Sequence, residues 1–348
     1  MEKLVVNETP VRTSRNFLIN NIKLEDVEIP NNLRAFDSIE YFSENTQLEK
    51  LDKKISLIYG NGKVLEDNCN ENANSSIKLN IDRKDNIKLK YNFDDNNLEL
   101  INRLEINANS DANIVIEYKS FTEKKCFHNG IIKINASPNI KLKIAVVNLL
   151  NKVSLNFDSF ENELSENANL EYTIIDIGAK ESISNYYSNI LGKAAKNNLE
   201  TVYLATDNQL KDINYIAELR GEETKINIDV QGALKNHSKK NFKGTIDFKK
   251  GCKKAVGDEN EYCMLLSDDS RSIALPMLLC TEDDVEGNHS TASGKVETDS
   301  LFYIMSRGIE YKEAIKLIVK ARFNKIIDRI EDEDLKEEIF KEIDRRLD

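Results

Sequence analysis

The sequence predicts a mainly β protein that ends in helices, and two patterns indicate this fold class. Between roughly Ile81 and Phe248, short segments of alternating apolar and polar residues are separated by clusters of Asn, Asp, Ser and Gly. Alternation with a period of two places apolar side chains on one face of a strand. From Ser300 onwards the apolar period changes to about 3.6 residues, which is typical of an amphipathic helix.

The alternating segments recur along the chain. An Asn followed by Ile or Leu begins such a segment at four positions, with spacings of 27, 26 and 30 residues: Asn86, Asn113, Asn139 and Asn169. Recurrence near this period predicts a stack of β coils, each of which buries its apolar face against the next. We expect irregular loops such as Asp158–Asn167 to project from the coils. A two-sheet sandwich has similar alternation, and the pattern alone also allows a globular all-β enzyme.

The first part of the chain is less regular. Residues 1–54 are mixed and polar, with weak amphipathic stretches, and we assign them to an N-terminal segment that is partly helical. Ile55–Tyr59 predicts a strand, and Gly60-Asn61-Gly62 after it predicts a hairpin turn. We place the β core in residues 55–299 and a helical subdomain in residues 300–348.

Two amphipathic helices are expected in the C-terminal subdomain. The first covers Tyr311–Ile330 and the second covers Leu335–Leu347, and each has one apolar stripe. An apolar stripe needs a partner surface. The widths of the stripes favour packing of the helices on each other and on the β region, as a cap, over docking to another protein.

The composition argues against two classes of partner. The chain has 348 residues and a formal net charge of -11, which is unfavourable for a general nucleic-acid-binding protein. Its apolar stretches, such as Ile144–Val147, are too short to span a bilayer.

The N-terminus lacks the features of a secretory signal, so the cytoplasm is the expected compartment. The five cysteines include no C-x-x-C pair and are expected to be reduced thiols.

The residues alone predict no active site. His128 lies in an expected turn and His237 in a polar stretch between strands, so we expect both to be loop histidines. Acidic pairs such as Asp268-Asp269 and Asp283-Asp284 occur in turn-like contexts, where solvated carboxylates are usual. Cys280 follows an apolar run, and we expect it to be buried. The sequence contains none of the common hydrolase, metalloprotease or nucleotide-binding motifs, so the residues alone give no reason to propose an active site.

Four segments of the C-terminal third carry a distinctive pattern. They are Leu265–Asp268, Pro276–Leu278, Glu282–Gly294 and Leu301–Ile309. In order and spacing they resemble the SufB/SufD family of iron–sulfur cluster assembly proteins. The parts Asp283-Asp284-Val285 and Phe302–Ile309 are most similar to the SufD branch of this family. The resemblance is specific over about Asp258–Ile330, moderate from about Ser184 and weak before it.

The resemblance implies a right-handed parallel β-helix flanked by helical segments. It also implies a non-catalytic scaffold subunit of the SUF iron–sulfur cluster assembly complex, which pairs with SufB through the β-helix and docks the SufC ATPase through its C-terminal helical region. A homodimer that uses SufC alone is a variant of this hypothesis. A cysteine desulfurase system is the implied source of sulfur. Iron or an iron–sulfur cluster is expected transiently at the dimer interface, and no tightly bound cofactor is expected in the isolated chain.

By the same resemblance, His289 corresponds to the histidine of the family's Cys-Ser-His motif and is a candidate ligand of iron or of the cluster. Gly287 occupies the position of the motif cysteine, and Ser290-Thr291-Ala292 replaces the motif's Gly-Ala-Thr. Glu286 and Cys263 are candidate auxiliary ligands. A structural role for His289, through a hydrogen bond that shapes the strand or the dimer interface, is equally open.

Partner contacts are expected in Ser306–Ile330, which the resemblance assigns to SufC binding. The candidate contact residues are Ser306, Arg307, Gly308, Ile309, Ala314 and Ile318. Two other functions remain open. One is a β-helical carbohydrate-active enzyme, which requires clustered carboxylates in a groove. The other is a purely structural SufB/SufD-family partner without metal chemistry, which the loss of the motif cysteine favours.

Overall fold

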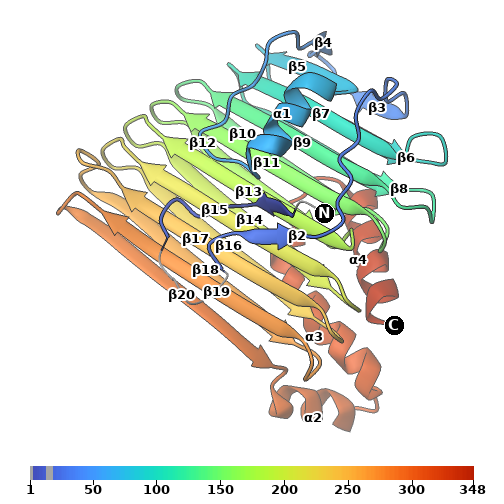
Figure 1. Ribbon diagram of the computed structural model, residues 1–348. Coiled ribbons are helices and arrows are strands. Elements are labelled where there is room, and N and C mark those ends of the chain that lie inside the picture. Colours follow the sequence, from blue (N-terminus) through green and yellow to red (C-terminus); the bar gives the residue numbers. More distant parts are fainter. Residues whose placement is uncertain (1–2, 13–18) are drawn as a thin grey trace.

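The computed structural model describes residues 3–12 and 19–348, and its centre is a parallel β-solenoid. Sixteen strands, from β5 (Ser75–Ile81) to β20 (Val285–Lys295), form eight coils. Each coil contributes one strand to an odd-numbered sheet and one to an even-numbered sheet, and the two sheets face each other (Figure 1). Within each sheet the solenoid strands pair in parallel. The parallel β-helix predicted from the sequence is confirmed.

The remaining solenoid strands are of similar length. In the odd sheet they are β7 (Glu99–Ala108), β9 (Phe127–Ala136), β11 (Leu155–Leu164), β13 (Glu181–Ile190), β15 (Leu210–Leu219), β17 (Lys239–Phe248) and β19 (Arg271–Cys280). In the even sheet they are β6 (Asp85–Phe93), β8 (Ala112–Ser120), β10 (Lys141–Leu149), β12 (Asn169–Asp176), β14 (Lys196–Ala205), β16 (Lys225–Leu234) and β18 (Ala255–Leu265). At the end of the first coil, β3 (Ile39–Phe42) and β4 (Glu49–Lys50) pair antiparallel with β6 and β5 and cover their edges.

Alternate side chains of each strand point into the solenoid and form its core. Ile87, Ile114 and Ile144 occupy one in-register ladder, and all three are buried. Each such side chain contributes about 1.5–3 kcal/mol when it is fully buried. The repeat in the sequence reflects these ladders only in part. Asn86 pairs with Asn113, so their spacing of 27 residues is one coil, whereas Asn139 lies in the turn before β10.

Helices cover the outer faces of both sheets. α1 (Lys63–Asn72) packs Leu65 and Cys69 on the odd sheet. On the even sheet lie α3 (Tyr311–Ile327) and α4 (Glu333–Leu347), whose Phe323 and Ile339 contact apolar side chains of β10, β12 and β14. The predicted packing of the C-terminal helices on the β region is therefore confirmed. Within residues 3–12 and 19–348, no helix has the length and apolarity that crossing a membrane requires.

The N-terminal segment lies on the outer face of the odd sheet as an extended strap (Figure 1). Its strands β1 (Leu4–Val6) and β2 (Ile22–Leu24) pair antiparallel with each other. The Asn7 side chain is buried and donates to Asp212 Oδ1 at 2.6 Å, where it covers the ion pair between Asp212 and Lys243. The helical element expected near the N-terminus is α1, which begins only at Lys63, after four short strands.

Two local predictions are wrong. Asp158–Asn167 is not a projecting loop, because residues up to Leu164 belong to β11. Both faces of β11 are buried, so its polar side chains lie inside and the strand lacks the alternation that would reveal it. Ile55–Tyr59 is not a strand of a hairpin either. Ile55 packs in the apolar cluster under α1, and Gly62, with a φ of 125°, precedes the first residue of that helix.

Candidate functional site: the open end of the solenoid

The last coil leaves one end of the solenoid open. β20 pairs with β18 on one side, and β19 pairs with β17. On their other sides, neither strand pairs with any strand of the described chain. β20 is the outermost strand of its sheet (Figure 1), and nearly all of its residues are exposed. Two adjacent free strand edges present unpaired N–H and C=O groups, and such edges pair readily with another chain.

His289 faces the interior at this open end. In the preceding even strand, β18, buried residues alternate with outer ones, and Glu259 belongs to the buried set. The register places His289 directly beside Glu259, so both side chains share the inward side of the sheet. His289 is nevertheless exposed, because the described chain adds no further coil over it. An imidazole at this place is accessible to a partner or to an ion.

The two auxiliary ligands that the sequence suggested do not join His289. Glu286 pairs with Val256 and therefore points to the outer face of the sheet. Cys263 is buried one coil deeper, in register with Ser293. Among the described residues, no group of three or more His, Cys, Asp and Glu side chains could hold a metal ion. Of the three suggested ligands, only His289 faces the interior at the open end, and metal binding by His289 stays a prediction.

Sequence reasoning missed Glu259, which is the most unusual side chain near the open end. It is fully buried, and neither carboxylate oxygen has a hydrogen-bond partner in the part of the chain that the structure describes. Burial, with a further contribution from Glu261, raises the pKa of Glu259 to about 8. The carboxylate lies over Gly244, where a Cβ would come within 2.2 Å of Oε2. The sequence did contain a signal that could have identified Glu259. Every second residue of this strand faces inward, and this set comprises Gly257, Glu259, Glu261 and Cys263, so two acids lie on the inward face.

Next to Glu259, the interior contains a buried ion pair between Lys240 and Glu261. Lys240 Nζ lies 2.8 Å from Glu261 Oε1, and Tyr203 donates to the same oxygen at 2.8 Å. Both members of the ion pair are fully buried. Burial raises the pKa of the neighbouring Cys263 thiol. A protonated, enclosed thiol is a poor nucleophile and a poor metal ligand, which again separates Cys263 from His289.

The other histidines occupy different environments. The prediction of a loop position is wrong for His128, which is fully buried in β9 between Asn102 and Asn156, at 2.8 and 2.6 Å. Burial lowers the pKa of His128 to about 4, so the ring is neutral at physiological pH. His237 lies in the turn between β16 and β17 and is largely exposed, as predicted.

Cys280 is exposed, so the prediction that it is buried is wrong. Cys280 pairs in register with Phe248 of β17, which faces the core, so Cys280 also faces inward. The next coil of a solenoid normally covers such a position. Because β19 is the last odd strand, no such coil follows within the described residues. The thiol donates to the Glu282 carbonyl at 2.9 Å.

The C-terminal helices expose a second surface. α2 (Thr298–Ser306) contains no buried residue, and Figure 1 shows it beyond the ends of β19 and β20. Phe302 is 73% exposed and Tyr303 is 61% exposed. We call Phe302, Tyr303 and Met305 the α2 aromatic patch. Neighbouring exposed apolar side chains on one helix make this patch a candidate interaction surface.

The six predicted contact residues divide between surface and core. Ser306, Arg307 and Gly308 are exposed and continue the α2 aromatic patch, and Arg307 lies over the Tyr303 ring at 5.2 Å. Ile309 is half-buried. Ala314 is fully buried, and Ile318 packs against the cluster under α3 and α4. Ala314 and Ile318 therefore pack within the helical cap, and partner binding by the six residues stays a prediction.

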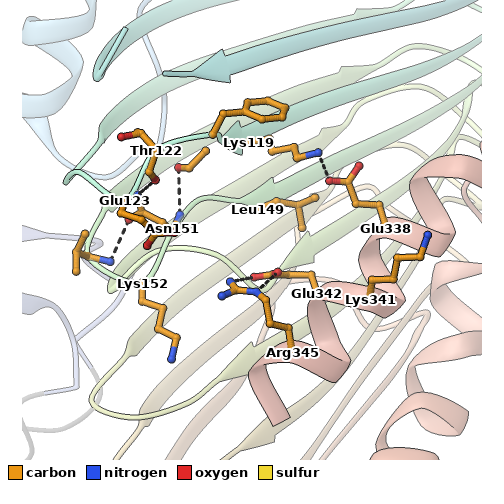
Figure 2. A pocket seen from close by; sticks show the side chains of 13 residues that line it. Lys119, Thr122, Glu123, Leu149, Asn151, Lys152, Glu338, Lys341, Glu342 and Arg345 are labelled. Atoms are coloured by element: carbon orange, nitrogen blue, oxygen red, sulfur yellow. Dashed lines mark hydrogen bonds and ion pairs between the residues drawn. The ribbon is translucent and has the colours of Figure 1, made fainter. Parts of the chain in front are cut away.

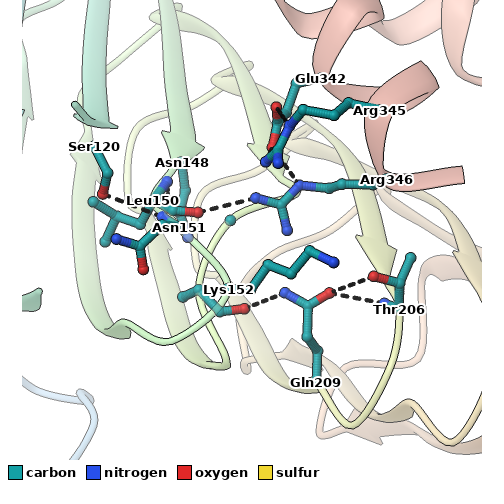
Figure 3. Close-up of polar contacts among 12 residues, drawn as sticks. Ser120, Asn148, Leu150, Asn151, Lys152, Thr206, Gln209, Glu342, Arg345 and Arg346 are labelled. Atoms are coloured by element: carbon teal, nitrogen blue, oxygen red, sulfur yellow. Dashed lines mark hydrogen bonds and ion pairs between the residues drawn. The ribbon is translucent and has the colours of Figure 1, made fainter. Parts of the chain in front are cut away.

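A cavity of about 670 Å³ lies between α4 and the turns that follow β8 and β10 (Figure 2). Two ion pairs lie within its lining, Lys119 with Glu338 and Arg345 with Glu342, while Lys152 and Lys341 pair with Asp207 and Glu337 outside it. Behind it, the buried Arg346 donates to Leu150 O at 3.0 Å and fixes the end of α4 to the solenoid (Figure 3). Paired charges of mixed sign favour no single class of charged ligand, so the cavity is not the leading candidate.

Comparisons with known proteins agree with this architecture. A family model described as "SUF system FeS cluster assembly, SufBD core domain" matches residues 95–322. The iron–sulfur cluster assembly protein SufD of Bacillus subtilis is 23% identical over 275 residues, which are 78% of this chain and 63% of that protein. An iron–sulfur cluster assembly SufBD family protein of Staphylococcus epidermidis is 25% identical over 193 residues, 55% of this chain and 41% of that protein. The matched part of the chain thus spans 63% of the first relative and 41% of the second, less than two thirds of either.

Proposed function

The chain belongs to the SufBD family of the SUF iron–sulfur cluster assembly system, and from this premise we propose that it is a SufD-like scaffold subunit without catalytic activity of its own. In this proposal it pairs with SufB through the open end of the solenoid and docks the SufC ATPase through the α2 aromatic patch. The observation that carries the proposal is the pair of free edges on β19 and β20. The cluster is cargo and not a resident cofactor.

The open end suits pairing with a similar chain. Its two strands offer backbone groups along 10 and 11 residues, so a partner with the same kind of end could continue both sheets. Continuation would also bury side chains that are exposed in the isolated chain, among them His289 and Cys280. A second copy of this chain could use the same edges, so the test below includes the chain alone.

The α2 aromatic patch suits a separate partner. It lies on a helix that packs weakly on the rest of the molecule, at the side of the solenoid where α3 and α4 lie. Aromatic side chains supply large contact area at low entropic cost, and they dominate many protein interfaces. Docking of an ATPase there leaves the strand edges free for SufB.

Iron held as cargo at the open end needs further ligands from a partner protein, because this chain offers few. His289 supplies one accessible nitrogen, and Glu259 supplies a buried carboxylate beside it. Gly287 faces inward, and a Cβ there would come within 3.0 Å of Phe248 Cε2, so a cysteine at this position requires the ring to shift. The absence of the motif thiol favours a second candidate function, in which the chain only completes the scaffold and SufB supplies the ligands.

Co-expression with the SufB and SufC of its own genome tests the proposal. We expect a tagged chain to recover both proteins in stoichiometric amounts. Replacing Phe302 and Tyr303 by Ser should remove SufC and leave SufB bound. Val64→Ser replaces an apolar residue of α1 that is 58% exposed, and as the control it should recover both. A chain that is recovered alone would contradict the proposal.

Proline substitutions test the strand edge. Ser290 and Thr291 are adjacent in β20, so their N–H groups point to opposite edges. One proline variant removes a backbone hydrogen bond to β18 and should destabilise the chain. The other removes an N–H group only from the free edge and should leave the stability of the chain unchanged. We expect this second variant to lose SufB and retain SufC.

A separate substitution tests the role of His289 in the same complex. His289→Ala should lower the iron content if His289 is a ligand, and leave it unchanged if the role is only structural.

A further inference from the structure

The last two strands of the even sheet place an imidazole beside a carboxylate. His289 of β20 and Glu259 of β18 are register partners in a parallel pair. Both side chains face the interior, because Glu259 belongs to the inward, buried set of β18 and register partners share a face of the sheet. Neighbouring strands lie about 4.8 Å apart, which is close enough for one hydrogen bond between the ends of two such side chains.

The outer face of the same two strands shows that their register partners do reach each other. Asn288 Nδ2 donates to Asp258 Oδ1 at 3.0 Å, and Ser290 Oγ donates to Asn260 Oδ1 at 2.6 Å. These are the register pairs immediately before and after the imidazole and the carboxylate. The spacing and alignment of β18 and β20 are therefore suitable for hydrogen bonds between register partners.

A histidine deeper in the solenoid already forms such a contact on the inward face. His128 Nδ1 lies 2.6 Å from Oδ1 of Asn156, its register partner in β11. The ring of His128 is fully buried. A covered histidine inside this solenoid thus uses an acceptor from the adjacent coil, and Glu259 is the acceptor that the adjacent coil offers to His289.

Glu259 is the member of the pair that lacks a partner. Neither of its oxygens has a hydrogen bond in the described chain, so His289 is not bound to it while the end is open. Lys240 does not serve it, because that ammonium pairs with Glu261. A fully buried carboxylate without a partner costs free energy, and burial raises the pKa of Glu259 to about 8. A locally unfavourable group of this kind is typical of a functional position.

We propose that Glu259 positions His289. When SufB covers the open end, one N–H of the imidazole donates to the Glu259 carboxylate. This hydrogen bond fixes the ring and leaves its other nitrogen available as a ligand for the cargo. Glu259 acts through His289 and is a positioning residue, not a ligand. This role rests on the proposed function, in which SufB is the covering partner.

A cation from SufB is the alternative partner for Glu259. The carboxylate is fully buried one coil below the open end, and His289 lies in the last coil above it. A Lys or Arg of SufB reaches the carboxylate only past the imidazole, whereas the imidazole is already adjacent. The geometry therefore favours His289, and a double substitution separates the two partners.

Dissociation constants for SufB, measured without iron at pH 8.5, test the pairing. At this pH the Glu259 carboxyl of the isolated chain is mostly ionised, because its pKa is about 8. Glu259→Met keeps the length of the side chain and removes the acceptor, and His289→Ala removes the donor. We expect each substitution to weaken SufB binding about tenfold, as for loss of a hydrogen bond to a charged group. Together they should also weaken binding about tenfold, instead of about a hundredfold.

Two further variants separate positioning from packing. Glu259→Gln keeps an acceptor oxygen and should recover most of the affinity that Glu259→Met loses. Equal affinities of the Gln and Met variants would show that the side chain only fills space, and would overturn the proposal. Asn260→Ala, on the outer face of the same strand, is the control and should add to the effect of His289→Ala without coupling.

The result for SufB binding distinguishes this role from the proposed function. Failure of the unaltered chain to bind SufB would overturn both. Binding of SufB with additive effects of Glu259→Met and His289→Ala would overturn the pairing alone, and would assign Glu259 to a group of SufB. Should Glu259→Met fail to fold, Glu259→Leu provides the second variant without an acceptor.

Discussion

Replacement of Glu259 by Gln should stabilise the protein at neutral pH and have little effect at acidic pH. The wild-type carboxyl is buried without a hydrogen-bond partner in the described chain, and its pKa is raised from 4.5 to about 8. A raised pKa means that the folded state holds the proton more tightly than the unfolded state. Stability from this group is therefore fully present below about pH 4.5 and is lost as the pH rises through about 8.

The magnitude follows from the two pKa values. The raised pKa of Glu259 lowers the free energy of unfolding by about 4 kcal/mol at pH 7.5 and by about 1 kcal/mol at pH 5. Gln carries no charge at either pH and has nearly the same shape. The difference in unfolding free energy between E259Q and the wild type should therefore be about 3 kcal/mol larger at pH 7.5 than at pH 5.

Urea unfolding of both proteins at the two pH values measures this difference. Asp258→Asn is the matched control, because Asp258 is the adjacent residue on the outer face, where it accepts from Asn288. We expect the control to change stability equally at both pH values. An E259Q effect that is the same at pH 5 and pH 7.5 would refute the reasoning, since it would show that Glu259 does not titrate in this range.

Three further substitutions test the packing and the surface. Gly244→Ala should destabilise the chain by at least about 2 kcal/mol, because its Cβ would lie 2.2 Å from the Glu259 carboxylate, and Glu259→Ala should restore much of the loss. Phe323→Ala should cost about 3–5 kcal/mol in thermal or urea unfolding, because the ring is fully buried between α3 and the even sheet. Phe302→Ser should change stability by less than about 0.5 kcal/mol, because the ring is 73% exposed, so loss of SufC in this variant would report binding and not folding.

The sequence was sufficient to predict the fold where strands alternate. Ile87 and Ile114 lie in one inward ladder because each strand has one apolar and one polar face, and period two reveals this pattern. β11 was missed because it is buried on both faces and carries Asn156, Asp158 and Asn162 inside the solenoid. Such interior polar residues obtain their partners from other coils, and one sequence does not show which coils meet.

The site was predictable only in outline. The resemblance located His289, but it did not show that Glu286 would face away from it or that Cys263 would be a coil deeper. Cys280 follows an apolar run, yet it is exposed because β19 is the last odd strand. Position along the solenoid axis decides exposure at the open end, and local sequence carries no information about it. Membership in the SufBD family also leaves the carbohydrate-active alternative without support.

Amide hydrogen exchange of the chain, alone and after addition of SufB and then SufC, tests the central claim most directly. We expect SufB to slow exchange in Val285–Lys295 and Arg271–Cys280, whose outer edges are free in the described chain. We expect SufC to slow exchange in Thr298–Ser306 and to leave the strand edges unchanged. Protection by SufB on the α1 side of the odd sheet, with β20 still exchanging at its original rate, would contradict pairing through the open end.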